Sequence, residues 1–271
     1  MADPTAFNVV IDGPIATIEL CSPQGNAFGP DYFNEASQVF DAINGNKDVR
    51  VVVLRGSGKT FSYGLNLPAM GQELMPLLQQ PGPKERQKLA AVIDNMQKSI
   101  NCIAECRVPV IAAVHNWCIG AGLDLVSAAD IRVCSADAQF SLREVKVAMV
   151  ADVGSLQRLP PIIGEGWTRR MALTGEDVDA ETALRIGLVS EVLDDKDACF
   201  TRAQNLAKAI ADNPPLVVEG IKDVMNERIE ADIQRGLRYV KQHNSAYLPS
   251  LDLGEALASF FEKRPPLYKG E

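Results

Sequence analysis

The stretch VPVIAAVHNWCIGAGLDLVSAADIRVCS, residues 108–135, predicts a strand, a tight turn, a helix and a second strand in direct succession. Its first part is a nearly continuous apolar run, which is typical of a strand buried on both faces. Gly120 and Gly122 then let the chain turn closely into a helix that we expect over residues 121–129. Residues 130–135 are β-rich again. This succession indicates an α/β core.

The same alternation continues toward the N-terminus, and helical patterns dominate from residue 163 onward. We expect the Pro-, Gly- and Gln-rich residues 68–83 to form a loop, and we expect separate helices over residues 214–227 and in the 230s. The remaining expected elements are strands at 7–11, 15–21 and 49–58, and helices at 30–45, 84–106, 165–175, 179–187, 196–213 and 252–264.

Composition narrows the class of protein and the compartment. The formal net charge of −8 argues against a nucleic-acid surface. The six cysteines form no CxxC pair and the two histidines lie far apart, so no metal site is expected and the thiols are expected to be reduced. The N-terminus, MADPTAF, does not resemble a signal peptide, and the longest uncharged run is short for a membrane span. We therefore expect a cytoplasmic enzyme with no membrane partner.

Two motifs resemble nucleotide-binding sequences but lack essential positions. GSGKT at residues 56–60 would need an earlier glycine at position 53, which is Val. The Gly-Ala-Gly turn that begins at Gly120 would need a third glycine where Leu125 stands. His115 lies in a predicted buried strand, and we interpret it as a core residue and not as a catalytic base.

Two glycine-containing turns can present bare backbone N–H groups to a ligand. Gly120 and Gly122 flank Ala121 where a buried strand becomes a helix, and Gly64 precedes Leu65 just after another predicted strand. Each glycine alone can be explained by turn geometry. Together the two turns can form an oxyanion hole, which is a pair of N–H donors aimed at a developing negative charge.

Three acidic residues follow in apolar surroundings: Asp124, Glu144 and Asp152. Each has a structural explanation as well as a catalytic one. Asp124 suits the first turn of a helix, Glu144 suits a solvated loop, and Asp152 suits an N-cap for the helix that follows it. Asp152 has no basic residue close by in the sequence, and an unpaired buried carboxylate is costly unless it has a use.

These residues lie within a longer resemblance that covers nearly the whole chain. Residues 112–144, AAVHNWCIGAGLDLVSAADIRVCSADAQFSLRE, resemble the signature of the crotonase (enoyl-CoA hydratase/isomerase) superfamily. The resemblance extends to GNAFG at 25–29, KTFSYGLNL at 59–67, ALTGEDVDAETALRIGLVSEVL at 172–193 and FFEKRPP at 260–266. It implies a crotonase-like α/β spiral of ββα units at residues 1–195, and a helical C-terminal region at 196–271 that forms a homotrimer or a dimer of trimers.

Within the superfamily, GAGLDL at 120–125 and REVKVAMVADVGSLQRLP at 143–160 are similar to the Δ3,5-Δ2,4-dienoyl-CoA isomerases. Those enzymes have Asp, Glu and Asp at the positions of Asp124, Glu144 and Asp152. The hydratases have Glu at the first two positions and a small residue at the third. The resemblance therefore implies isomerisation of a 3,5-dienoyl-CoA to a 2,4-dienoyl-CoA. A 2-enoyl-CoA hydratase and a non-catalytic acyl-CoA binding protein remain as alternatives.

The resemblance also assigns roles to residues. The thioester oxygen would accept the N–H groups of Leu65 and Ala121. Asp152 would remove a proton from C2, Glu144 would deliver one to C6, and Asp124 would orient its neighbours. No metal or other cofactor is implied, since CoA is part of the substrate. Residues implied to contact the substrate or its CoA are Phe61, Ser62, Gly64, Asn66, Leu67, Gly120 and, from a neighbouring subunit, Lys263.

Overall fold

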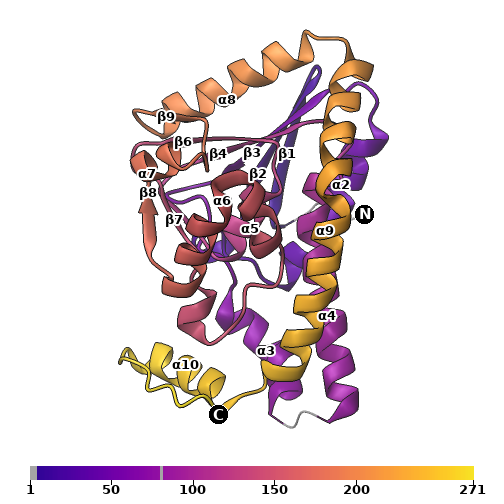
Figure 1. Ribbon diagram of the computed structural model, residues 1–271. Helices are drawn as coiled ribbons and strands as arrows, with labels where there is room; N and C mark the ends of the chain where they lie inside the picture. Colours follow the sequence, from indigo (N-terminus) through magenta and orange to yellow (C-terminus); the bar gives the residue numbers. More distant parts are fainter. Residues whose placement is uncertain (1–4, 80–81) are drawn as a thin grey trace.

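Six strands form the central sheet, in the order β1-β2-β3-β4-β6-β9 (Figure 1). The computed structural model describes residues 5–79 and 82–271. Strand β1 is antiparallel to β2, and the other neighbours are parallel. The strands are β1 (Phe7–Asp12), β2 (Ile15–Leu20), β3 (Val51–Gly56), β4 (Val110–Val114), β6 (Ile131–Ser135) and β9 (Glu191–Leu193).

A second, three-stranded sheet begins where β4 ends. It has the order β5-β7-β8, with β5 (Trp117–Ile119) parallel to β7 (Gln139–Ser141) and β7 antiparallel to β8 (Asp177–Asp179). Only two residues separate β4 from β5, so the chain passes from one sheet to the other immediately before Gly120. The turn at Gly120 is therefore fixed by hydrogen-bonded strands on its N-terminal side.

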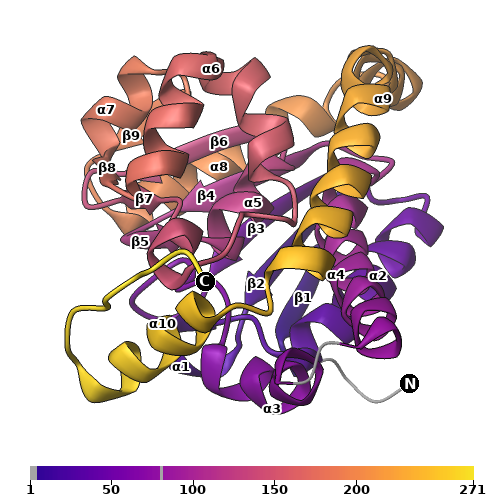
Figure 2. The ribbon, with the colours of Figure 1, turned by 60° about the horizontal axis from the view of Figure 1, so that its bottom comes forward.

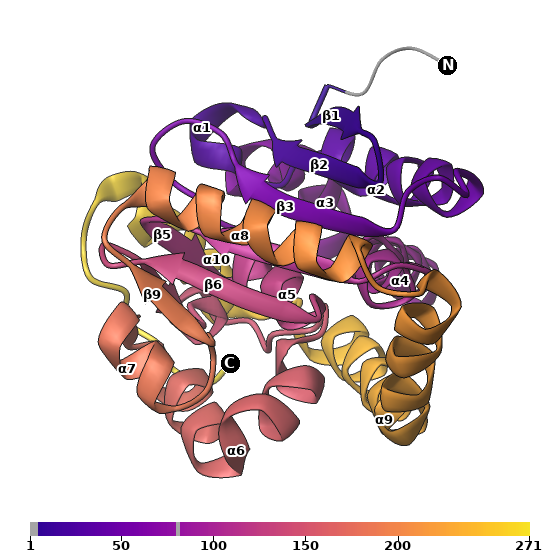
Figure 3. The same ribbon diagram turned by 90° about the horizontal axis from the view of Figure 1, so that it is seen from above.

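Strand β3 shows why the central strands are apolar on both faces. Val52 and Leu54 belong to the main core, whereas Val51 and Val53 pack with a separate cluster under α8 (Lys196–Ala211). Small residues spaced by four along α8 let it lie close to the sheet, which it crosses in Figure 3. They are Cys199, Ala203, Ala207 and Ala211. The prediction of a doubly buried strand is confirmed.

Helices cover the opposite face of the sheet in layers. Helix α2 (Pro30–Gly45) packs on α4 (Pro83–Ala104), and α4 packs on α9 (Pro215–Tyr247) (Figure 2). The other helical segments are α1 (Pro23–Asn26), α3 (Leu67–Leu78), α5 (Ala121–Ser127), η1 (Glu144–Val147), α6 (Ser155–Thr174), α7 (Ala180–Arg185) and α10 (Leu251–Glu262). The expected α/β core with a helical C-terminal region is present. The division into domains at residue 195 stays a prediction, since α8 packs directly on the sheet.

Two expectations about helices are wrong. Much of the region expected to be a loop forms α3, because the Asn66 side chain caps the helix by accepting the Ala69 N–H at 3.1 Å. Pro68 falls in the first turn, where a proline removes no helical hydrogen bond. The helices expected at 214–227 and in the 230s are one helix, α9, of 33 residues. Packing against α4 stabilises α9, so the helix continues through the polar residues in the middle of this segment.

A buried ion pair anchors α9 to the core. The Lys222 ammonium, 6% exposed, donates to Asp130 Oδ2 at 2.8 Å and to the carbonyl oxygens of Val108 and Ile103 at 3.1 and 3.3 Å. Asp130 Oδ2 also accepts the Val110 N–H at 2.7 Å. One lysine thus ties the first half of α9 to the end of α4 and to the starts of β4 and β6.

We predict that Lys222→Ala lowers the free energy of unfolding by about 3 kcal/mol, because it leaves a partly buried carboxylate and two carbonyl groups without their donor. Chemical denaturation measures the change. Lys208→Ala is the control: Lys208 forms an exposed ion pair with Asp212 within α8, and its loss should cost about 0.5 kcal/mol or less. Equal effects of the two substitutions would contradict the anchoring role.

Candidate active site

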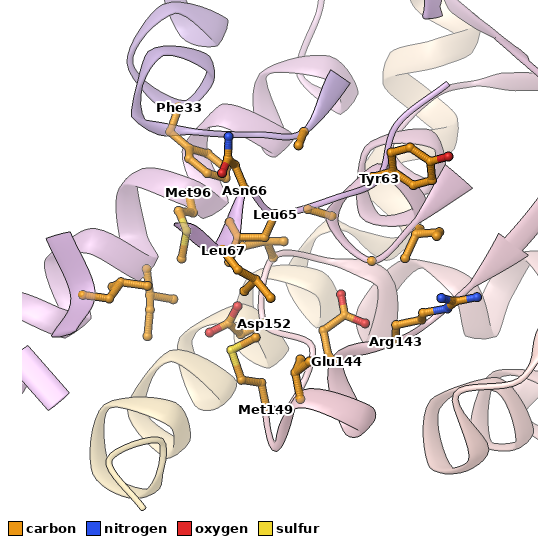
Figure 4. Close-up of a pocket in the computed structure, with 18 of the residues that line it drawn as sticks. Phe33, Tyr63, Leu65, Asn66, Leu67, Met96, Arg143, Glu144, Met149 and Asp152 are labelled. Carbon is orange, nitrogen blue, oxygen red and sulfur yellow. The ribbon is translucent and has the colours of Figure 1, made fainter. Parts of the chain in front are cut away.

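A cavity of about 460 Å³ lies between α3, α4, η1 and the loop that precedes α6. Its wall is largely apolar, with Leu and Ile side chains and Met96 from α4 on one side. Two carboxyl groups, those of Glu144 and Asp152, interrupt this apolar wall (Figure 4). Asp152 lies on the side of Met96 and Phe33, and Glu144 lies on the side of Tyr63 and Arg143. Carboxyl groups in such surroundings are candidates for proton transfer.

The two glycine-containing turns meet at this cavity. Gly64 has φ +76°, and a Cβ atom on it would lie 2.5 Å from the Ile119 oxygen and 3.3 Å from the Ala121 nitrogen. Only a glycine therefore permits this approach. Among the described residues, none accepts a hydrogen bond from the N–H of Leu65 or of Ala121. Leu65 and Ala121 both line the cavity. The turns thus bring the N–H groups of Leu65 and Ala121 to one wall of the cavity, and their role as an oxyanion hole stays a prediction.

Phe61 and Ser62 lie behind this wall and do not line the cavity. Both are fully buried. The Ser62 hydroxyl donates to the Asn26 oxygen at 2.8 Å and accepts the Gly64 N–H at 3.0 Å. These contacts hold the turn before Leu65 in place. The expected direct contact of Phe61 and Ser62 with substrate therefore has no support in the structure, and their position is that of supports for the turn.

Glu144 begins η1 beside the Gly120 turn. Its Oε1 lies 3.1 Å from the position that a Cβ atom on Gly120 would occupy, and its Oε2 has no partner among the described residues. Burial raises the pKa of Glu144 above its usual range, and the neighbouring charge of Asp124 raises it further. Glu144 is therefore part of the cavity wall and is not a solvated loop residue.

Asp152 has a partner that its local sequence does not show. Its Oδ2 accepts a hydrogen bond from Asn244 Nδ2 of α9 at 2.7 Å, and its backbone oxygen accepts one from Gln97 Nε2 of α4 at 2.7 Å. Burial raises the pKa of Asp152 to about 7; the hydrogen bond from Asn244 lowers it, and the charge of Asp124 raises it. The expectation that Asp152 is unpaired is wrong, because the partner lies 92 residues away in sequence.

Asp124 lies behind the cavity, fully buried. Its Oδ1 accepts the Ser155 N–H at the start of α6 at 2.5 Å. The capping role considered for Asp152 thus belongs to Asp124, and the N-cap residue itself is Gly154. Burial raises the pKa of Asp124, whereas the Ser155 hydrogen bonds and the Arg158 guanidinium lower it. Asp124 is not part of the cavity wall, and its charge raises the pKa of Glu144 and of Asp152.

The remaining predicted contacts are divided between the cavity and the surface. Asn66, Leu67 and Gly120 line the cavity, and Gly64 lies next to it. Lys263 is exposed at the end of α10 and lies outside the cavity wall, although Phe260 of the same helix is part of it. Three further residues of the site are not predicted from the sequence: Asn244, Gln97 and Phe260. No motif marks them, because they reach the site from helices distant in the chain.

No group of three or more His, Cys, Asp or Glu side chains within residues 5–79 and 82–271 is arranged to hold a metal ion. Within the same ranges, no helix combines the length and the apolar character needed to cross a bilayer.

An apolar cavity lined by two carboxyl groups and by two backbone N–H groups without a partner is typical of an enzyme active site. Residues 11–271 match the enoyl-CoA hydratase/isomerase family, and the chain belongs to it. The crotonase fold is therefore confirmed. A crystal structure of an enoyl-CoA hydratase/isomerase from Mycobacterium paratuberculosis is similar, with a TM-score of 0.84 and 27% identity over 96% of this chain and 100% of that one.

Two curated relatives are more similar in sequence. The chain is 41% identical to the mitochondrial Delta(3,5)-Delta(2,4)-dienoyl-CoA isomerase of Dictyostelium discoideum, over 94% of this chain and 87% of that protein. It is 37% identical to the peroxisomal Delta(3,5)-Delta(2,4)-dienoyl-CoA isomerase of Arabidopsis thaliana, over 98% and 93%. These names overturn the expectation of a cytoplasmic enzyme, because both relatives are named for organelles. The composition of MADPTAF and of the uncharged run, on which that expectation rested, does not assign a compartment.

We predict that Gly64→Ala lowers turnover of the acyl-CoA substrate about 100-fold, the loss typical of one displaced oxyanion donor. The added Cβ atom would overlap the Ile119 oxygen and move the Leu65 N–H. Steady-state kinetics measure the effect.

Gly58→Ala is the matched control, because Gly58 also has a positive φ but has no atom within 4 Å of its Cβ position. It carries the backbone strain without the overlap. If both variants lose activity equally, strain and not displacement of the donor explains the loss.

Proposed function

We propose that the protein converts a 3,5-dienoyl-CoA to a 2,4-dienoyl-CoA. The observation that carries this proposal is the pair of carboxyl groups, Glu144 and Asp152, that face one apolar cavity beside two free N–H donors. Shifting both double bonds requires removal of a proton at C2 and delivery of one at C6, so it needs two proton-transfer groups at separate positions. The names of the Dictyostelium and Arabidopsis relatives support the same reaction.

The N–H groups of Leu65 and Ala121 bind the thioester oxygen in this proposal. Loss of the C2 proton places negative charge on that oxygen, and the donors stabilise the resulting enolate, which is conjugated with the double bonds at C3–C4 and C5–C6. Because they belong to fixed turns, no reorganisation is needed as the charge develops. The charge returns from the oxygen when C6 is protonated, which leaves double bonds at C2–C3 and C4–C5.

The position of Glu144 favours C2 as its target. C2 is bonded to the thioester carbon, so its proton must lie close to the oxyanion donors, and Glu144 packs against the Gly120 turn that carries one of them. Asp152 lies farther along the cavity, toward Met96 and Phe33, which suits C6. We therefore reverse the assignment expected from the sequence, in which Asp152 served C2 and Glu144 served C6.

Proton transfer in this scheme requires one ionised and one protonated carboxyl group. Glu144 accepts the C2 proton as a carboxylate, and Asp152 donates to C6 as an acid. Burial raises the pKa of Glu144 to about 8 and that of Asp152 to about 7, and the charge of Asp124 raises both. Near neutral pH the pair therefore shares a proton that lies mainly on Glu144, and the reaction starts from the less populated form in which Asp152 carries it. After one turnover Glu144 carries the proton, and exchange restores the starting state. The role of Asp124 in this scheme is its negative charge, which favours the protonated forms of Glu144 and Asp152.

The scheme needs no metal or redox cofactor, because only protons move and CoA belongs to the substrate. Asn66, Leu67 and Gly120 contact the acyl or pantetheine part of that substrate from the cavity wall. Lys263, exposed outside the wall, binds the CoA of a neighbouring subunit. Gly64 acts by permitting the approach of the two turns.

We predict that Asp152→Asn and Glu144→Gln each lower isomerisation by about 10²–10⁴-fold, because an amide cannot exchange the proton. Formation of the 2,4-dienoyl-CoA, whose double bonds are conjugated with the thioester carbonyl group, is followed by its absorbance, beside hydration of a 2-enoyl-CoA. Asp124→Asn should be milder, since Asp124 does not line the cavity.

A wild-type protein that hydrates well and does not isomerise, with a silent Asp152→Asn, would establish the hydratase alternative. Binding of acyl-CoA without turnover of either substrate would favour the binding protein. In both cases the isomerase proposal is rejected.

The protein also assembles into a trimer, or a pair of trimers, in this proposal. The first turns of α9 expose a set of apolar side chains: Leu216, Val217, Ile221, Val224 and Met225. A contiguous apolar face of this kind marks an interaction surface. We predict a trimer or hexamer by light scattering at micromolar concentration, and a smaller species for Ile221→Glu/Met225→Glu. A monomeric wild-type protein would contradict both the assembly and the contribution of Lys263.

A further inference from the structure

Asn244 is a buried amide of α9 that contacts a carboxyl group of the cavity. It is 2% exposed, and its Nδ2 donates to Asp152 Oδ2 at 2.7 Å and to the Val150 backbone oxygen at 2.8 Å. Both amide hydrogens therefore bind one short loop. Oδ2 of Asp152 is engaged, and Oδ1 is the oxygen left to exchange a proton with a ligand.

A second amide fixes the same loop from the opposite side. Gln97 of α4 donates through Nε2 to the Asp152 backbone oxygen at 2.7 Å and to the Leu237 oxygen of α9 at 3.0 Å. The two amides have different targets. Gln97 holds the main chain, whereas Asn244 is the side chain that binds the carboxyl group itself.

We infer that Asn244 is a positioning residue that orients the Asp152 carboxyl group and holds it ready to exchange a proton through Oδ1. The inference rests on the proposed function of Asp152. It assigns to α9, which begins about sixty residues after the loop, a direct part in the proton chemistry. The amide acts through Asp152 and does not itself exchange a proton, because an amide does not titrate in this range.

The charged groups around Asp152 define what a change at Asn244 would do. Asp124 of α5 and Glu144 of η1 face it, and Arg158 of α6 lies beside Asp124. On α9 itself, Lys241 lies about one turn before Asn244 and is paired with Asp94 of α4. Neither acidic neighbour donates a hydrogen bond to Asp152, so the amide of Asn244 is the side-chain donor that stabilises its ionised form.

Removal of that donor changes the pKa of Asp152 in a definite direction. A hydrogen bond to the ionised form lowers the pKa of a carboxyl group, so its loss must raise the pKa of Asp152 from about 7. Because Asp152 and Glu144 share one proton, a rise at Asp152 moves the pH profile of kcat/KM to higher pH. A purely structural role of Asn244 would lower the rate without moving the profile.

The test is Asn244→Ala, compared with wild type in the 3,5-dienoyl-CoA assay across pH. We expect kcat to fall by about 10- to 100-fold, as for loss of a hydrogen bond to a charged group, and the profile to shift to higher pH. In the Asp152→Asn background, Asn244→Ala should lower the rate further by less than about threefold, because the carboxyl group on which it acts is absent.

Asn226→Ala is the matched control. Asn226 lies on the same helix and donates its amide to the Ala104 backbone oxygen at 3.1 Å, away from the cavity. It removes one amide-to-carbonyl contact between α9 and α4, and it should leave both the rate and the profile unchanged. An equal effect of the two substitutions would overturn the inference.

A second variant and a second readout keep the inference testable if Asn244→Ala does not fold or if the wild type does not isomerise. Asn244→Asp keeps the side-chain shape and sets a carboxyl group against Asp152, which should also raise its pKa. Carbon-13 NMR of labelled aspartate carboxyl groups, with the Asp152 signal assigned by its loss in Asp152→Asn, gives that pKa without turnover.

The outcomes separate the two claims. A wild type without isomerase activity rejects the proposed function, and the NMR titration still decides the role of Asn244. An active wild type, with an unchanged profile and an unchanged Asp152 pKa in a folded Asn244 variant, rejects the inference alone.

Discussion

Placing three carboxyl groups close together in apolar surroundings is the constraint on which the rest of this site depends. Ionising all of them would cost far more than the fold can supply, since each charge loses its water and repels the others. The structure compensates unequally. A helix N-terminus and Arg158 stabilise the Asp124 carboxylate, so its pKa is raised only to about 6, whereas the pKa values of Glu144 and Asp152 are raised to about 8 and about 7. The proton that the acidic pair retains is the one that the proposed reaction moves.

The oxyanion donors depend on a different constraint, which is the close approach of two backbone segments. Gly64 contacts the main chain at Ile119, so the two turns can present Leu65 and Ala121 to one point only while this contact is kept. The passage of the chain from β4 to β5, between the two sheets, fixes one turn. Ser62 and its hydrogen bonds fix the other. A rigid donor pair of this kind suits charge that develops during a reaction.

The C-terminal helices connect these parts. Lys222 anchors α9 at its N-terminal half, and Asn244 extends from its C-terminal half to Asp152. Phe260 of α10 adds to the cavity wall. The region that the family resemblance associates with assembly is thus also part of the site. A change in the packing of α9 would therefore be expected to reach the carboxyl group that it holds.

The sequence by itself determined the strand pattern, the family, the two glycine turns and the three acidic residues, because each of these is a local pattern with a physical meaning. It failed for α3, where Asn66 and the apolar contacts of one face outweigh the prolines. It failed also for the environment of Asp152, and it gave no indication that Ser62 supports the turn before Leu65. Only the tertiary structure decided these, since a hydrogen bond between residues 152 and 244 leaves no trace in the composition or spacing of either segment.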